Sequence, residues 1–161
     1  MRRITPADAD ALMRFYNGLS SPSKRTFHPL GPLTDRATCE QIAGDNAAGD
    51  AGRYDLIVQH GEQIVGWCFI CGLNKEPSLG LGIADAHQGR KLGRALVSAV
   101  MHWARARRLP AVHLTVVHDN AAARRLYESF GFVVRGEHLS EEDGLSYCHM
   151  TTEVPAKAKK Q

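Results

Sequence analysis

Three cations stand at the start of a long helical pattern, where they could bind an anion. Arg90, Lys91 and Arg94 follow Gly89, and cations in the first turns of a helix oppose the positive end of its dipole. A bound phosphate would reverse that unfavourable charge, because the free backbone amides of a helix N-terminus bind anions. The segment therefore predicts a site for a phosphorylated ligand, with a solvated basic turn as the alternative.

A second segment able to carry chemistry runs from Asp119 to Phe132 and contains Tyr127. It follows a strand pattern and has the periodicity of a short amphipathic helix, capped by Asp119 or Asn120. A phenol placed beside a reacting group can donate a proton to it. A tyrosine on an apolar helix face is more often a core aromatic, so the helix alone leaves both roles open.

Hydrophobic periodicity predicts the elements that must position these two segments. The 161 residues have the length of one domain, which we expect over residues 1–154, with a disordered basic tail over 155–161. Helices are expected over residues 6–16, 34–43, 89–108 and 121–130, with a loop over 20–32. Strands are expected over residues 2–4, 54–59, 63–71, 78–83, 112–117, 133–139 and 145–154.

The strand expected over residues 78–83 has two unlike faces. Its apolar residues alternate with Gly80 and Gly82, so one face is apolar and the other carries almost no side chains. A ligand lying flat on the bare face would account for the glycines. Tight packing against a neighbouring element is the alternative.

The overall charge does not favour nucleic acid as a partner. The chain has 20 Lys and Arg against 17 Asp and Glu, a surplus too small for that role, and the lysines of the tail are too few to add to it. No apolar run is long enough to cross a bilayer, and no apolar signal core follows Met1. We therefore expect a cytoplasmic protein with neither nucleic acid nor membrane as a partner.

The cysteines do not predict a metal site. Cys68 and Cys71 have the spacing of a zinc knuckle, but no second pair follows them. Residues three apart on a strand also point to opposite faces and cannot share a metal. We expect the four cysteines to be buried thiols.

The phosphate-binding segment resembles a known family. Gln88 to Gly93 reads Gln-Gly-Arg-Lys-Leu-Gly and is similar to the Gln/Arg-x-x-Gly-x-Gly/Ala signature of the GCN5-related N-acetyltransferase (GNAT) family. Asn120 to Phe132 resembles the family's Asn-x-x-Ala-x-x-x-Tyr pattern followed by Gly-Phe. Both motifs occur in family order, within a resemblance over roughly residues 54–152. Lys91 departs from the signature, because the family usually has a glycine at this position. If the position requires a positive φ, the lysine backbone would be strained.

The resemblance implies an α/β (α+β) fold of three layers. A central mixed, mostly antiparallel sheet of about six or seven strands would be flanked by about four helices. The strands over 78–83 and 112–117 would splay apart around the pantetheine of acetyl-CoA, the implied cosubstrate. The cofactor-binding residues that the resemblance implies are Ile83, Ala84, Gln88, Gly89, Arg90, Lys91, Leu92, Gly93, Arg94, Asn120 and Tyr127.

The family's reaction is transfer of an acetyl group to an amine. We expect an N-acetyltransferase in which a primary amine of a small molecule or peptide attacks the thioester directly in a ternary complex. Tyr127 resembles the family's proton donor to the leaving thiolate, and the amides of Ile83 and Ala84 are expected to hold the oxyanion. No Cys-His or Ser-His pair is expected to form an acyl-enzyme. The alternative function is a non-catalytic acyl-CoA-binding module that regulates a partner.

The general base and the acceptor stay open at this point. In this family the first two helices and the loop between them shape the acceptor site, here residues 17–34. Homodimerisation is also left open. The base is water or one of the ionisable residues expected near the cleft, which are Glu76, Asp85, His87, His118 and Asp119.

Overall fold

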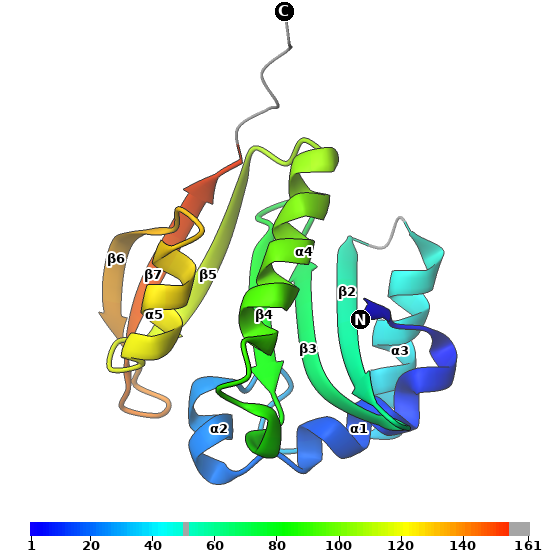
Figure 1. The fold of residues 1–161 in the computed structure, drawn as a ribbon. Coiled ribbons are helices and arrows are strands. Elements are labelled where there is room, and N and C mark those ends of the chain that lie inside the picture. The colour runs from blue at the N-terminus through cyan, green and yellow to red at the C-terminus, as the bar shows by residue number, and fades with distance from the viewer. Residues whose placement is uncertain (50–51, 155–161) are drawn as a thin grey trace, which may run out of the picture.

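The computed structural model describes residues 1–49 and 52–154, so the expected disordered tail lies outside the described residues. Seven strands form one sheet in the order β1-β2-β3-β4-β5-β7-β6 (Figure 1). Only β4 and β5 are parallel neighbours, which confirms the expected mixed, mostly antiparallel sheet. The strands are β1 (Arg2–Arg3), β2 (Arg53–His60), β3 (Gln63–Cys71), β4 (Ser78–Ile83), β5 (Ala111–Val117), β6 (Val133–Leu139) and β7 (Ser146–Glu153).

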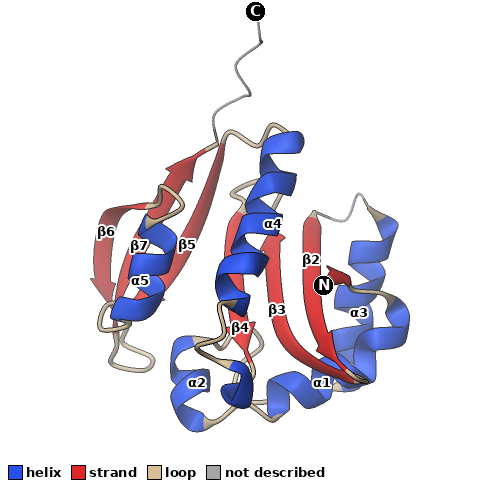
Figure 2. Ribbon diagram, in the orientation of Figure 1, coloured by secondary structure: helices blue, strands red, loops and turns tan. Residues whose placement is uncertain are grey.

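Helices cover both faces of the sheet and make the three expected layers (Figure 2). They are α1 (Ala9–Asn17), α2 (Ser21–Thr26), α3 (Arg36–Ala48), α4 (Leu92–Ala106) and α5 (Ala121–Glu128). Short 3-10 turns, η1 (Pro6–Asp8) and η2 (Asp85–His87), precede α1 and follow β4. Within the described part of the chain, no helix is long and apolar enough to cross a membrane.

Two apolar cores lie on opposite faces of the sheet. One contains Leu96, Val100 and Met101 of α4 together with Tyr127 of α5. The other joins α1 and α3 to the strands around Trp67. Cys68 belongs to the first core and Cys71 packs against the second. The two thiols therefore point to opposite faces, as predicted, and cannot share a metal.

Strands β4 and β5 pair with each other over a very short length. Ser78 and His113 are their one register pair, and the His113 amide donates to the Pro77 carbonyl oxygen at 2.8 Å. Beyond that point the strands diverge toward the end of the sheet at which α2 lies (Figure 1). The splay implied by the family resemblance is thus present.

One helix lies where a loop was expected. Helix α2 begins after Ser20, whose side chain accepts a hydrogen bond from the Ser23 amide, and Pro22 occupies its first turn. A six-residue helix of this composition has little stability of its own. Contacts with distant side chains hold it, and these contacts leave no periodic signal in the sequence.

Two other helix boundaries differ from the prediction. Helix α3 is capped by Asp35 instead of Thr34 and continues through Gly44 to Ala48. The buried Asn46 side chain accounts for the extension, because it donates to the Ile4 carbonyl oxygen and accepts from the Asp55 amide. Helix α4 begins at Leu92, three residues later than Gly89, because the preceding loop has left-handed backbone at Lys91.

A buried carboxylate ties β2 to β3 beneath α3. Asp55 is fully buried and accepts two hydrogen bonds of 2.7 Å from the Arg53 guanidinium. It also accepts one of 2.9 Å from the Trp67 indole N–H. Such a pair is stable only while every member is present, because a single buried charge without its partner has lost its hydration.

We predict that Asp55→Ala lowers the free energy of unfolding by about 3 kcal/mol or more, since it leaves the Arg53 charge and the Trp67 donor without partners. Urea denaturation of the two proteins measures the difference. The control is Arg36→Ala, which removes exposed ion pairs with Asp10 and Glu40 and should change stability by less than about 1 kcal/mol. Equal effects of both variants would contradict the role given to the buried carboxylate.

Candidate functional site

A cleft of about 760 Å³ opens where β4 and β5 diverge. The N-terminal end of α4, the helix α5 and the segment around α2 complete its walls. Of the residues predicted to bind the cofactor, only Ala84 and Arg90 are outside its lining. The predicted residues that line it are Ile83, Gln88, Gly89, Lys91, Leu92, Gly93, Arg94, Asn120 and Tyr127.

The loop before α4 exposes a set of backbone donors. Gly89 has φ 73° and Lys91 has φ 63°, so the chain turns sharply before the helix begins. The first helical hydrogen bond found runs from the Ala95 amide to the Lys91 carbonyl oxygen at 3.2 Å. The preceding amides of the first turn therefore have no helical acceptor. Free amides of this kind can bind an anion, here at the mouth of the cleft.

The cations of this segment are free to meet an anion. Within residues 1–49 and 52–154, no ion pair engages Arg90, Lys91 or Arg94. The Arg94 guanidinium lies 5.6 Å from the centre of the Phe130 ring, which orients it without neutralising it. These three cations therefore stand unpaired at the positive end of the α4 dipole. This is the unfavourable arrangement that the sequence predicted.

The edge of β4 supplies further donors inside the cleft. Ile83 lies opposite Gly66 of β3, and the Ala84 amide donates to the Val65 carbonyl oxygen at 2.9 Å. Because N–H directions alternate along an antiparallel ladder, the amides of Ile83 and Leu81 point away from β3, toward the splay. The expectation for Ile83 agrees with this geometry. Ala84 was a wrong choice as an oxyanion donor, because its N–H is already used.

Tyr127 reaches the cleft from α5. Asn120 caps this helix by accepting from the Ala123 amide at 3.2 Å, which settles the choice between Asp119 and Asn120. The Tyr127 ring is 7% exposed and packs edge-on against Phe132, so the side chain is fixed. Its hydroxyl makes no hydrogen bond within the described part of the chain. Burial raises the pKa of Tyr127, because desolvation disfavours the phenolate.

The bare face of β4 is covered by aromatic rings. A Cβ atom at Gly80 would overlap the Phe69 ring, and one at Gly82 would overlap the Phe27 ring. The interpretation that a ligand lies flat on this face is therefore wrong for the structure described. Tight packing, the alternative considered from the sequence, explains both glycines.

Helix α2 bridges the two diverging strands. Asp85, after β4, accepts hydrogen bonds from the Ser20 amide at 3.0 Å, from the Ser20 hydroxyl and from the Ser23 hydroxyl at 2.8 Å. Asp119, after β5, accepts two hydrogen bonds of 3.0 and 2.8 Å from Arg25. The helix is thus held from both sides of the cleft mouth.

The same contacts decide between the candidate bases. Hydrogen bonds from Ser20 and Ser23 lower the pKa of Asp85, and the hydrogen bond from Arg25 lowers the pKa of Asp119. A carboxylate with a lowered pKa is a weaker base. Neither Glu76 nor His118 lines the cleft. Of the five candidates, His87 alone lines the cleft without such a bond to its side chain.

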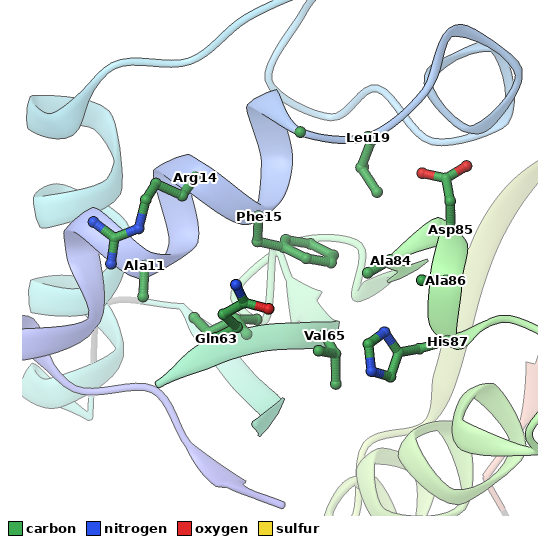
Figure 3. A pocket seen from close by; sticks show the side chains of 12 residues that line it. Ala11, Arg14, Phe15, Leu19, Gln63, Val65, Ala84, Asp85, Ala86 and His87 are labelled. Carbon is green, nitrogen blue, oxygen red and sulfur yellow. The ribbon is translucent and has the colours of Figure 1, made fainter. Parts of the chain in front are cut away.

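His87 also borders a second hollow, of about 430 Å³, between the end of α1 and the start of β3. Figure 3 shows the His87 ring beside Val65, while the Asp85 carboxylate points toward Leu19. The Nδ1 atom of His87 is buried and has no hydrogen-bond partner among the described residues. His87 therefore lines both cavities, and its Nδ1 atom is enclosed by the protein.

Sequence reasoning missed several residues of the cleft. Thr115 and Leu81 line it from the two diverging strands, and Pro22, Thr26 and Phe27 line it from the α2 segment. The α2 residues fall within residues 17–34, which the family resemblance implied for the acceptor site, but a loop was expected there and none of them was named singly. N–H directions alternate along a strand, so the Leu81 amide must point the same way as the Ile83 amide. The sequence could therefore have indicated Leu81.

The structure brings one cysteine and one histidine together. The Cys148 Sγ atom lies 3.5 Å from the His118 Nδ1 atom. Cys148 is fully buried and is outside the cleft lining. Burial also raises the pKa of its thiol. The pair is therefore not placed to form an acyl-enzyme in this cleft.

We predict that Lys91→Gly raises the free energy of unfolding of the ligand-free protein by about 1 kcal/mol, because glycine adopts positive φ without strain. Arg108 is the matched control, since it has φ 57° at the far end of α4 and should respond equally to Arg108→Gly. Chemical denaturation of both variants measures the effect. Stabilisation at Arg108 without stabilisation at Lys91 would show that the loop before α4 is not strained.

Comparisons with known proteins agree with this geometry. The model of the acetyltransferase (GNAT) family matches residues 14–132. Mycothiol acetyltransferase of Acidothermus cellulolyticus is 39% identical over 102 residues, which cover 63% of this chain and 26% of that protein. The chain therefore spans about a quarter of the length of that relative.

Solved structures share the fold over almost the whole chain. The GNAT-family acetyltransferase from Streptococcus pneumoniae has a TM-score of 0.82 at 24% identity, covering 96% of this chain and 98% of that one. The protein yncA from Salmonella typhimurium, solved with its cofactor acetyl-CoA, has a TM-score of 0.80 at 20% identity, covering 99% and 96%. The family match and the splayed sheet lead to one conclusion: the chain belongs to the GNAT acetyltransferase family.

Proposed function

We propose that this protein is an acetyl-CoA-dependent N-acetyltransferase, which transfers the acetyl group to a primary amine by direct attack in a ternary complex. The observation that carries the proposal is one continuous cleft. It connects the free amides and unpaired cations at the start of α4 with the hydroxyl-bearing side chain of Tyr127. A phosphate site and a proton donor in a single cleft are what transfer from a coenzyme A thioester requires.

The residues present fit the coenzyme. In this proposal the amides of Leu92 and Gly93 bind the pyrophosphate, and the Arg90, Lys91 and Arg94 cations lie near the coenzyme's phosphates. The outward amides of Leu81 and Ile83 are free to bind pantetheine or the thioester oxygen. Acetyl-CoA supplies an activated thioester carbonyl; positioning and proton transfer are left to the protein.

Tyr127 is the proposed proton donor to the leaving thiolate. Its raised pKa keeps the hydroxyl protonated throughout the neutral range. The hydroxyl has no competing acceptor among the described residues, so it is available to a ligand in the cleft. A regulatory module that only binds acyl-CoA has no use for such a donor, and this favours the catalytic function over the alternative.

The acceptor amine must lose a proton before it attacks. Asp85 and Asp119 are unsuitable as bases because their carboxylates are held by α2 and have lowered pKa values. We therefore assign proton removal to water, or to His87 where the two hollows meet. An amine suits this arrangement, since an alcohol would need a strong base to become a nucleophile.

The proposed acceptor is a small-molecule or peptide amine bound near residues 17–34, where α2 and Phe27 border the cleft. The relative from Acidothermus cellulolyticus is named for a small molecule, mycothiol, which is consistent with this class. A cytoplasmic location and homodimerisation stay predictions.

We predict that Tyr127→Phe lowers kcat by a factor of about 10 to 1000, toward the lower part of the range for one lost acid catalyst, with little change in the affinity for acetyl-CoA. The phenyl ring keeps the packing against Phe132, so folding should be preserved. Thiol release and coenzyme titration measure the two quantities. Tyr54→Phe is the control, because Tyr54 stacks on Trp103 outside the cleft and its hydroxyl should not affect turnover. Unchanged kcat in Tyr127→Phe would make Tyr127 a core residue only.

We also predict sequential kinetics and a turnover that rises with pH as the acceptor amine loses its proton. Asp85 and Asp119, with lowered pKa values, are ionised well below neutral pH, while Tyr127, with a raised pKa, stays protonated above it. None of these groups should therefore titrate between about pH 6 and 9.

A thiol-release screen tests the acceptor class. The panel contains amino acids, polyamines, aminoglycosides, peptides with free N-termini and lysine peptides, each with acetyl-CoA. Activity confined to one group identifies the class. Tight coenzyme binding with no acceptor across the panel would favour the regulatory module, and ping-pong kinetics would contradict direct attack.

A further inference from the structure

Three ligand-type side chains converge on one face of the sheet, outside the cleft described above. Cys148 of β7 lies directly opposite Glu137 of β6 and opposite Val116 of β5. Directly opposed residues point to the same face, and so does His118, two residues after Val116. The register therefore brings a thiol, a carboxylate and an imidazole from three neighbouring elements to one point.

The distances between the three ligand atoms are those of a metal site. His118 Nδ1 lies 3.2 Å from Glu137 Oε1 and 3.5 Å from Cys148 Sγ, and Cys148 Sγ lies 3.6 Å from Glu137 Oε1. In tetrahedral zinc sites, with Zn–S about 2.3 Å and Zn–N or Zn–O about 2.0–2.2 Å, ligand atoms stand about 3.3–3.6 Å apart. The three separations agree with this range to about 0.1 Å.

Hydrogen bonding satisfies only part of this triangle. The Cys148 thiol can donate to the Glu137 carboxylate, and His118 Nδ1 carries at most one proton for the same carboxylate. The contact between Nδ1 and the sulfur is then left without a proton, whereas a cation at the centre would bind all three atoms at once.

Hydrogen bonds to its backbone fix the chain at His118. The His118 amide donates to the Ser146 carbonyl oxygen at 2.8 Å, and its carbonyl oxygen accepts from Arg124 at 3.1 Å. Cys148 is fully buried, whereas His118 and Glu137 are about half exposed. A path for an ion and a water molecule therefore exists from the solvent side.

We propose that His118, Glu137 and Cys148 bind a Zn²⁺ ion, with water in the fourth position. Thiolate and imidazole ligands together select zinc over magnesium or calcium. Binding removes the Cys148 thiol proton to solvent, so that sulfur and carboxylate carry the two negative charges that balance the ion. The ion would join the end of β5 to β6 across β7 and brace the half of the sheet on which α5 packs.

Cobalt provides the most direct test, because a cysteine ligand gives Co²⁺ a thiolate-to-metal charge-transfer band in the near ultraviolet. The full chain is stripped with a chelator and titrated with Co²⁺, and then with Zn²⁺ against a chromophoric chelator. We expect one equivalent of either metal, displacement of the Co²⁺ band by Zn²⁺, and release of about one proton per ion near neutral pH. Mg²⁺ and Ca²⁺ should leave the band unchanged.

Variants assign the ligands. Cys148→Ser should abolish the charge-transfer band, and His118→Asn and Glu137→Gln should each weaken Zn²⁺ binding about 100-fold. The latter two positions are half exposed, so these variants keep the test valid if Cys148→Ser fails to fold. His149→Asn is the matched control, since this imidazole is exposed, contacts His138 and alternates with Cys148 onto the opposite face of β7.

Three outcomes would overturn the proposal. The first is the absence of a charge-transfer band together with Zn²⁺ binding no tighter than that of free histidine. The second is zinc binding that survives in both His118→Asn and Glu137→Gln. The third is zinc binding that is lost in His149→Asn, which would move the ion to the imidazole pair on the opposite face.

Discussion

The constraint on which the rest of this structure depends is the single parallel junction in an otherwise antiparallel sheet. Parallel neighbours cannot be joined by a tight turn, so the chain leaves β4 through a loop and returns to β5 through α4. The two strands share one register pair and then separate. The separation leaves backbone donors of β4 unused and puts the N-terminus of α4 beside them, so the proposed coenzyme site depends on this topology.

The short helix α2 limits what the side chains at the open end of the junction can do. It binds the carboxylates of Asp85 and Asp119, two of the five candidate bases considered from the sequence. These residues connect the strand ends to the segment that borders the acceptor side. Gln88 adds a third link, because its side-chain amide donates to both the Ser23 hydroxyl and the Ile83 carbonyl oxygen. Side-chain hydrogen bonds therefore connect the loop before α4 to the α2 segment.

The sequence predicted the sheet and most of the candidate cofactor residues, because these depend on local signals. Strand alternation, the loop from Gln88 to Gly93 and the Asn120 cap are all readable within about ten residues, and the positive φ of Lys91 agrees with the departure noted at that position. Contacts between residues far apart in the chain could not be predicted from the sequence. Asn46 extends α3 past a glycine by bonding to β2, and Asp85 stabilises a helix 62 residues earlier in the chain. The group of His118, Glu137 and Cys148 likewise depends on strand register, which no spacing in the sequence reveals.

The aromatic cover on β4 bears on how mutational tolerance in this protein is to be interpreted. Gly80 and Gly82 stand beside the cleft, and replacing either with any larger residue forces Phe69 or Phe27 to move. If a substitution scan were scored by enzyme activity, replacement of either glycine would therefore lower the score. That result would suggest that both glycines touch the coenzyme. The intolerance would in fact report packing of the strand against the Phe69 and Phe27 rings. Functional maps of this region thus need a separate measure of folding at each position before they can be read as maps of ligand contact.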